Sequence, residues 1–205
     1  MRATGPQADG ADMARSGRLL SLNVARASAV TIRERQVMTA IGKRAVDGPR
    51  AVAMLGIEGD EQADLTVHGG PSKAVYAYPS EHFAFWQTVR AQAGVAPWDE
   101  PLVPGALGEN LTLAGLVESD VFIGDVLRFP NGALAVSGPR FPCFKFNAAM
   151  GFVHAAKLMV QSGWCGWYFS ARETGTIAAG ESFTLEPGPR EVGIVELFRA
   201  RTGRS

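Results

Sequence analysis

Short apolar runs separated by glycines, prolines and polar residues are the dominant pattern along this chain. Leu19 to Val24 and Ala74 to Tyr78 are short, apolar-rich runs, and the second also contains aromatic and β-branched residues, as buried strands do. Similar runs recur along the chain, and we expect further strands at residues 36–41, 51–55, 111–113, 121–123, 126–129 and 133–137. Many short strands joined by turn residues are typical of β-barrels.

A few stretches have helical features instead. Ser80 can cap a helix whose apolar residues recur at a spacing of three and which ends at Gly94. A second helix is expected from Asn147, a good N-cap, to Val160, and a shorter one over residues 192–199. The pattern therefore predicts a β-rich barrel with about two inserted helices.

Two segments of the chain, 121–129 and 176–185, both place a glycine and an acidic residue before a strand, as repeated turns in a barrel would. We divide the chain into a polar, flexible tail over residues 1–17, one domain over residues 18–187, and a C-terminal segment over residues 188–205.

Composition limits the possible partners. Twenty basic and twenty acidic residues give a formal net charge of zero, so no bulk charge favours binding to nucleic acid or to an anionic membrane. No apolar run is long enough for a membrane span, and the N-terminus lacks the apolar core of a signal peptide. The two cysteines do not form a disulfide framework, and we expect a cytoplasmic protein with both thiols free.

Cys143 is the first candidate for chemistry. It follows Pro142 in a proline-stiffened segment, and Arg140 and Lys145 are its basic neighbours in sequence. Positive neighbours favour the thiolate, which is the form that acts as nucleophile or metal ligand. The alternative is a buried thiol that only packs, as free cysteines often do. Cys165, which lies among aromatic residues, is expected to pack.

The segment from Asp60 to Lys73 is the second candidate. Asp60, Asp64 and His68 are spaced by four and would share one face of a helix, where they could bind a divalent metal. The β-branched residues and glycines of this segment argue against a helix. The better interpretation is a loop at Gly69–Gly70 whose backbone N–H groups could hold an anion, and the alternative is a plain turn.

Two further loops offer polar groups. Asn110 lies beside a glycine-rich turn, and Thr39 precedes the small basic loop that ends at Lys43. In both loops the polar residues could equally make the turn itself.

Taken together and in this order, the candidate segments resemble the MOSC-domain family, which is named for the C-terminal domain of molybdenum cofactor sulfurase. The chain is most similar to the small, stand-alone bacterial members, over roughly residues 18–187. The segments that carry the resemblance are Thr39–Lys43, Gly59–Pro79, Gly108–Thr112, Ile123–Asp125 and Pro139–Cys143.

The resemblance implies a closed β-barrel of mixed strands with peripheral helices, similar to the barrel domain of pyruvate kinase. It implies a pocket for the molybdenum cofactor, with Cys143 as the protein's own metal ligand. It also implies reduction of N-hydroxylated compounds to amines, with electrons from an external protein. Asp64 and His68 would orient loops or touch substrate. The residues that would hold the cofactor are Arg140, Lys73, Lys43, Thr39, Gly69, Gly70, Asn110 and Ser137.

Two alternatives remain open. Cys143 could carry a persulfide in a sulfur carrier or transferase, because the same reactive thiol serves both roles. The chain could also be a cofactor carrier without its own chemistry. Ser170 stands where family members commonly have a basic residue, which motivates this second alternative.

Overall fold

A computed structural model describes residues 15–63 and 69–203 of the chain. Seven strands form a closed barrel, in which each neighbour pairs antiparallel except for β7 and β8, which are parallel. β10 pairs with both β9 and β11 and so closes the barrel. In order around the barrel the strands are β10 (Asn131–Pro139), β9 (Val126–Phe129), β12 (Ser182–Glu186), β1 (Ser16–Val24), β8 (Leu111–Ala114), β7 (Val75–Pro79) and β11 (Trp167–Ile177).

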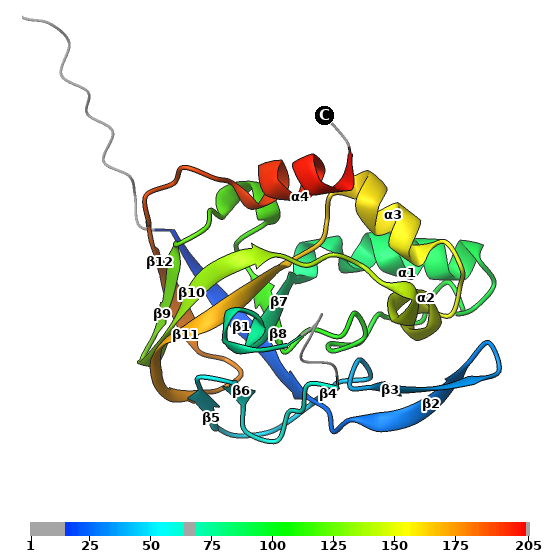
Figure 1. Cartoon of the computed structure of the whole chain (residues 1–205), viewed down its shortest axis with the longest axis horizontal. Helices are drawn as coiled ribbons and strands as arrows, with labels where there is room; N and C mark the ends of the chain where they lie inside the picture. The colour runs from blue at the N-terminus through cyan, green and yellow to red at the C-terminus, as the bar shows by residue number, and fades with distance from the viewer. Residues whose placement is uncertain (1–14, 64–68, 204–205) are drawn as a thin grey trace, which may run out of the picture.

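Smaller elements extend this barrel. β5 (Arg50–Ala53) and β6 (Gly56–Ile57) add to β11, and β4 (Arg44–Ala45) pairs with β1. β2 (Ser28–Ile32) and β3 (Arg35–Thr39) form a separate hairpin, which extends away from the barrel in Figure 1. The 3₁₀ helices are η1 (Pro71–Lys73), η2 (Ser80–His82) and η3 (Glu118–Asp120).

Four helices pack outside the barrel within the described residues, as Figure 1 shows. α1 (Phe83–Gln92), α2 (Phe144–Met150) and α3 (Ala155–Ser162) gather at one side, and α4 (Ile194–Thr202) crosses the top of the view. The predicted class, a closed barrel of mixed strands with peripheral helices, is confirmed.

The barrel interior explains why these segments become strands. In β12 the buried residues Phe183 and Leu185 alternate with exposed ones, and Leu185 pairs with Leu127 of β9. The two segments with a glycine and an acidic residue before a strand are therefore neighbours in the barrel. Alternation of this kind places one face of each strand in the core and the other outside.

Several predicted boundaries are wrong. Residues 121–123 form no strand, and Phe122 makes only an isolated bridge to Gly193. The helix expected from Asn147 to Val160 is two helices, because Gly151 adopts a left-handed conformation (φ 84°) that ends α2. Asn147 is not the expected N-cap, because it lies inside α2, whose N-cap is Cys143; its Oδ1 instead accepts a hydrogen bond of 2.7 Å from the N–H of Ala156 in the first turn of α3.

Residues 1–14 of the expected tail lie outside the described residues, and β1 begins at Ser16, two residues before the expected start of the domain. The C-terminal segment contains α4, which buries Ile194 and Phe198. No helix in the described part of the chain is long and apolar enough to cross a membrane.

Candidate functional site

One pocket brings together most of the side chains singled out in the sequence. It has a volume of about 100 Å³ and is lined by Cys143 and, among others, Thr39, Lys43, Lys73, Asn110 and Arg140. These six residues come from four separated segments of the chain, which only the folded barrel makes neighbours. The predicted residues Asp64 and His68 lie outside the described residues, so their positions stay a prediction.

Cys143 is half-buried and lies between the end of β10 and the start of α2. Burial lowers the pKa of Arg140, whereas nearby tyrosines and the Cys143 thiol raise it, and the net shift is upward. Burial raises the pKa of Tyr168, and Arg140 opposes that shift while Cys143 adds to it. Cys143, Arg140 and Tyr168 are therefore within electrostatic reach of one another.

Arg140 is a buried cation, with a side chain that is 5% exposed. Its guanidinium carbon lies 5.2 Å from the ring centroid of Tyr76 and 4.6 Å from that of Phe146. Within residues 15–63 and 69–203 no carboxylate forms an ion pair with it. Buried charges are normally compensated, so this cation at the wall of a pocket can bind an anion that enters from outside.

Lys43 and Asp60 form a buried ion pair at another wall of the pocket. Burial lowers the pKa of Lys43, and the Asp60 carboxylate partly offsets that shift. Because the charge of Lys43 is already neutralised by Asp60, its contribution to binding a further anion is smaller than that of Arg140.

Asn110 holds the loops together from beneath the pocket. Its amide donates to the Asn23 carbonyl oxygen (3.1 Å) and to Asp60 Oδ2 (2.9 Å), and its Oδ1 accepts from the Tyr76 N–H (3.1 Å). All three contacts are within the protein, so Asn110 positions Asp60 and β7. The Thr39 hydroxyl similarly accepts from the N–H of Ile41 (3.2 Å).

Three predicted binding residues lie beside the pocket rather than in it. Ser137 faces a neighbouring cavity and donates its hydroxyl hydrogen to the Ser72 carbonyl oxygen. Gly69 and Gly70 precede η1, and the Gly70 N–H donates to Gln62 Oε1 at 2.8 Å. The sequence predicted that this N–H could donate to an anion, but it donates to a side chain of the protein instead.

The sequence analysis missed two tyrosines and a buried acid. Tyr76 and Tyr168 are antiparallel partners on β7 and β11, their ring centroids are 5.4 Å apart, and both line the pocket. Glu109 lies behind the pocket, where burial raises its pKa to about 7 despite hydrogen bonds from the backbone of Gly105 and Leu107. Both tyrosines lie in apolar strand segments. Apart from the aromatic ring itself, nothing in the sequence indicates that they line a pocket.

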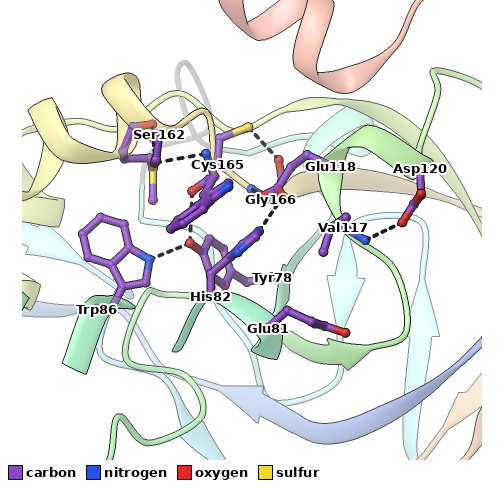
Figure 2. Close-up of polar contacts among 12 residues, drawn as sticks. Tyr78, Glu81, His82, Trp86, Val117, Glu118, Asp120, Ser162, Cys165 and Gly166 are labelled. Carbon is purple, nitrogen blue, oxygen red and sulfur yellow. Dashed lines mark hydrogen bonds and ion pairs between the residues drawn. The ribbon is translucent and has the colours of Figure 1, made fainter. Parts of the chain in front are cut away.

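A buried polar network fixes the turn that precedes β11 (Figure 2). Glu118 accepts the N–H of Gly166 at 2.8 Å and lies 2.8 Å from Nε2 of His82. The His82 ring stacks on Trp164 with centroids 4.4 Å apart. Because the Gly166 carbonyl oxygen accepts the N–H of Arg140 at 3.5 Å, this network also supports the segment that leads to Cys143.

Cys165 belongs to this network and not to the pocket. Its side chain is fully buried, and its thiol donates to the Gly166 carbonyl oxygen at 3.2 Å. Burial raises its pKa well above the ordinary value, so it stays a protonated thiol. The packing role expected from the sequence agrees with this position. Among the described residues, no cluster of three or more His, Cys, Asp or Glu side chains could hold a metal ion.

Comparison with known proteins agrees with the barrel fold. The family model described as MOSC domain matches residues 64–184. The chain is 38% identical to YflK of Bacillus subtilis (strain 168) over 167 residues, which is 82% of this chain and 72% of that protein. It is 38% identical to YiiM of Escherichia coli (strain K12) over 161 residues, 77% of this chain and 68% of that protein.

A fungal relative and a solved structure add to this comparison. A protein of Gibberella moniliformis named as a reductase is 33% identical over 171 residues, 81% of this chain but 29% of that longer protein. The crystal structure of YiiM from Geobacillus stearothermophilus matches with a TM-score of 0.71 and 32% identity, covering 90% of this chain and 83% of that one.

Proposed function

Because this chain belongs to the MOSC-domain family, we propose that it binds the molybdenum cofactor at Cys143 and reduces N-hydroxylated compounds to amines. The observation that carries the proposal is a half-buried thiol in one pocket with a buried arginine that has no carboxylate partner in the described part of the chain. The fungal relative named as a reductase supports the reaction class.

The residues of the pocket fit this cofactor. Molybdenum held by a dithiolene accepts one more soft anionic ligand, and the Cys143 thiolate has that chemistry. The pterin carries a phosphate, and Arg140 and Lys73 are cations at the pocket wall. Lys73 lies 5.9 Å from the ring centroid of Tyr168, so this ammonium is positioned over an aromatic face.

When bound, the cofactor would supply the two electrons of the reaction. A hydroxylamine R–NHOH takes up two electrons and two protons and gives R–NH₂ and water, with the N–O bond broken. An external electron-transfer protein would provide the electrons. Tyr168 stays a protonated phenol because burial raises its pKa, so its hydroxyl can donate a hydrogen bond to an oxygen in the pocket. Arg140 remains charged and holds negative charge there.

Elemental analysis tests the cofactor part of the proposal. Protein produced with abundant cofactor should contain nearly one molybdenum per chain, and the Cys143→Ser protein should lose it. Cys165→Ser is the matched control, because that thiol is buried outside the pocket, and it should keep the metal. Molybdenum retained by Cys143→Ser would contradict the assignment of the ligand.

Activity is tested separately with a chemical reductant. The loaded wild type should convert an N-hydroxylated base to the amine, and Cys143→Ser should not. If intact-mass spectrometry instead found a sulfur adduct on Cys143 and no metal in the wild type, the chain would be a sulfur carrier. Full metal without turnover would indicate a cofactor carrier.

A further inference from the structure

A second cavity of about 240 Å³ adjoins the Cys143 pocket. Lys73 and Tyr168 line both cavities and form the wall between them. The chain segment that leads to Cys143 also borders both: Pro139 and Phe141 line the second cavity, whereas Arg140 and Cys143 line the first. The two cavities are therefore neighbours, close enough for the two ends of one ligand to reach both.

The second cavity is basic at its rim. Its lining includes Lys73 and Arg201, the hydroxyl-bearing residues Ser72 and Ser137, and no acidic residue among those the structure describes. Arg201 takes part in no ion pair within the described residues. The Ser137 hydroxyl hydrogen is used by the Ser72 carbonyl oxygen, so the two cations and the Ser72 hydroxyl are the groups that can donate to a phosphate oxygen here.

Arg201 is held at this rim by the packing of α4. Phe198, one turn earlier in the helix, is fully buried, and its ring stacks on Phe141 with centroids 5.4 Å apart and an angle of 16° between the planes. Since Phe141 belongs to the segment that leads to Cys143, α4 and the thiol are connected by a rigid contact. The position of Arg201 relative to the pocket therefore depends on this contact.

The Cys143 pocket also opens on another side, into a groove of about 960 Å³ along the β2–β3 hairpin. Thr39, Lys43 and Lys145 line both the pocket and this groove. The larger groove offers more room for a bulky pterin, which leaves the smaller cavity for another ligand. The second cavity, of about 240 Å³, has room for a phosphate group, since one water molecule occupies only about 30 Å³ in the liquid.

We propose that the second cavity binds the phosphate of a nucleotide substrate whose N-hydroxylated base reacts at Cys143. This inference rests on the proposed function for the reaction and on Arg201, Lys73 and the Ser72 hydroxyl for the recognition. It makes N-hydroxylated nucleoside monophosphates better substrates than the corresponding nucleosides, because only the former carry an anion into the basic cavity.

The test compares N-hydroxycytidine with its 5′-monophosphate in the molybdenum-loaded protein. Each charge-assisted hydrogen bond contributes enough for about a tenfold change in affinity, so the monophosphate should have a KM lower by about tenfold or more. Arg201→Ala should remove this advantage and leave kcat and the nucleoside KM unchanged. Arg199→Ala is the matched control, because Arg199 lies in the same helix and lines a different groove, and it should behave as the wild type.

A second variant tests the cavity itself. A Cβ added at Gly138 meets no atom within 4 Å, so Gly138→Val would fill space in the cavity without a backbone clash at the Cβ. It should also remove the monophosphate advantage. Equal KM values for the two substrates in the wild type, or equal weakening of both by Arg201→Ala, would overturn the proposal. Lower molybdenum content in Arg201→Ala would overturn it as well, because the cavity would then hold the cofactor's own phosphate.

Calorimetry separates this inference from the proposed function. Titration of the protein with cytidine and cytidine 5′-monophosphate, which need no reaction, should show tighter binding of the monophosphate and loss of the difference in Arg201→Ala. That result would support the phosphate site even if no N-hydroxylated compound were reduced. Equal affinities for the two ligands in the wild type would contradict the phosphate site and would not affect the proposed reductase function.

Discussion

The guanidinium of Arg140 packs on the ring of Phe146, with 4.6 Å between the guanidinium carbon and the ring centroid. Phe146 lies in α2, the helix that begins directly after Cys143. Cation and thiol are thus fixed to the same short segment of chain, one on each side of Pro142. This contact gives the site a positive charge whose position does not depend on a carboxylate.

Replacing Arg140 by methionine should weaken cofactor binding without lowering the stability of the protein. Methionine keeps apolar packing against Phe146 and removes a buried charge, so the free energy of unfolding should stay within about 1 kcal/mol of the wild type or rise. The molybdenum content at limiting cofactor should fall by about tenfold or more, because the anion loses a charged donor. Urea unfolding and elemental analysis measure the two effects.

Arg190→Met is a control in which the opposite outcome is expected: lower stability and unchanged metal content. Arg190 also lies over an aromatic ring, that of Phe122, but it pairs with the buried carboxylate of Asp125. Its loss should cost about 1–3 kcal/mol of stability and leave the metal content unchanged. If both variants lost stability and both kept the metal, Arg140 would have no special role in the site.

Glu109 should make stability depend on pH. Its pKa is raised from 4.5 to about 7 chiefly by burial, so the folded protein holds this proton more tightly than the unfolded chain does. The corresponding stability, about 3 kcal/mol, is fully present below pH 4.5 and is lost as the pH rises through about 7. The measurement is the free energy of unfolding between pH 4.5 and 8.

The slope of that pH profile is the readout for Glu109. Glu109→Gln has no proton to lose, so the fall in stability with pH should become shallower even if the variant is less stable at every pH. Glu191→Gln, at an exposed position, should keep the wild-type slope. An unchanged slope in Glu109→Gln would mean that another group titrates in this range.

Local patterns account for much of the fold. Alternating burial in β9 and β12 is visible in the sequence, as is the apolar run of β7, and these strands form where expected. The end of α2 at Gly151 was missed because a single glycine inside an apolar stretch does not by itself show that the chain turns. None of the residues of β2 is buried, and only its pairing with β3 marks it as a strand.

The candidate site was predictable where its residues are close in sequence. Arg140 and Cys143 lie three residues apart, and basic neighbours of a lone cysteine were a local signal. Tyr168 reaches the pocket because β11 pairs with β7, and Arg201 reaches the second cavity because Phe198 stacks on Phe141. Such long-range pairings have no local signal. Asn110 lines the pocket, its contacts within the protein appear only in the structure, and its role in cofactor binding stays a prediction.

The pair of Lys43 and Asp60 should behave as one buried unit. Their side chains are 8% and 5% exposed, so removing one partner leaves a charge without compensation, at a cost of about 3–5 kcal/mol. Lys43→Met and Asp60→Asn should each destabilise the protein by this order. The double variant should lose less stability than the sum of the two single losses. A double-mutant cycle of urea unfolding measures this difference. Additive losses would show that the two charges do not interact.

Glu118 should affect both the stability of the protein and the binding of the cofactor. Its carboxylate accepts the Gly166 N–H and contacts His82 (Figure 2). Glu118→Ala leaves two buried polar groups without a partner, at about 1–3 kcal/mol each. Because the Gly166 carbonyl oxygen holds the N–H of Arg140, the same variant should also lower the molybdenum content at limiting cofactor.

Glu118→Gln is the matched variant for this network. Its amide oxygen can still accept the Gly166 N–H, and its NH₂ group can donate to His82, so both the stability and the metal content should lie closer to those of the wild type. His82→Phe keeps an aromatic ring to stack on Trp164 but leaves the buried Glu118 carboxylate with only the Gly166 N–H as a hydrogen-bond donor among the described residues, so it should also destabilise the protein clearly more than Glu118→Gln does. If Glu118→Ala lost stability but kept the full metal content, the turn at Gly166 would not position Arg140.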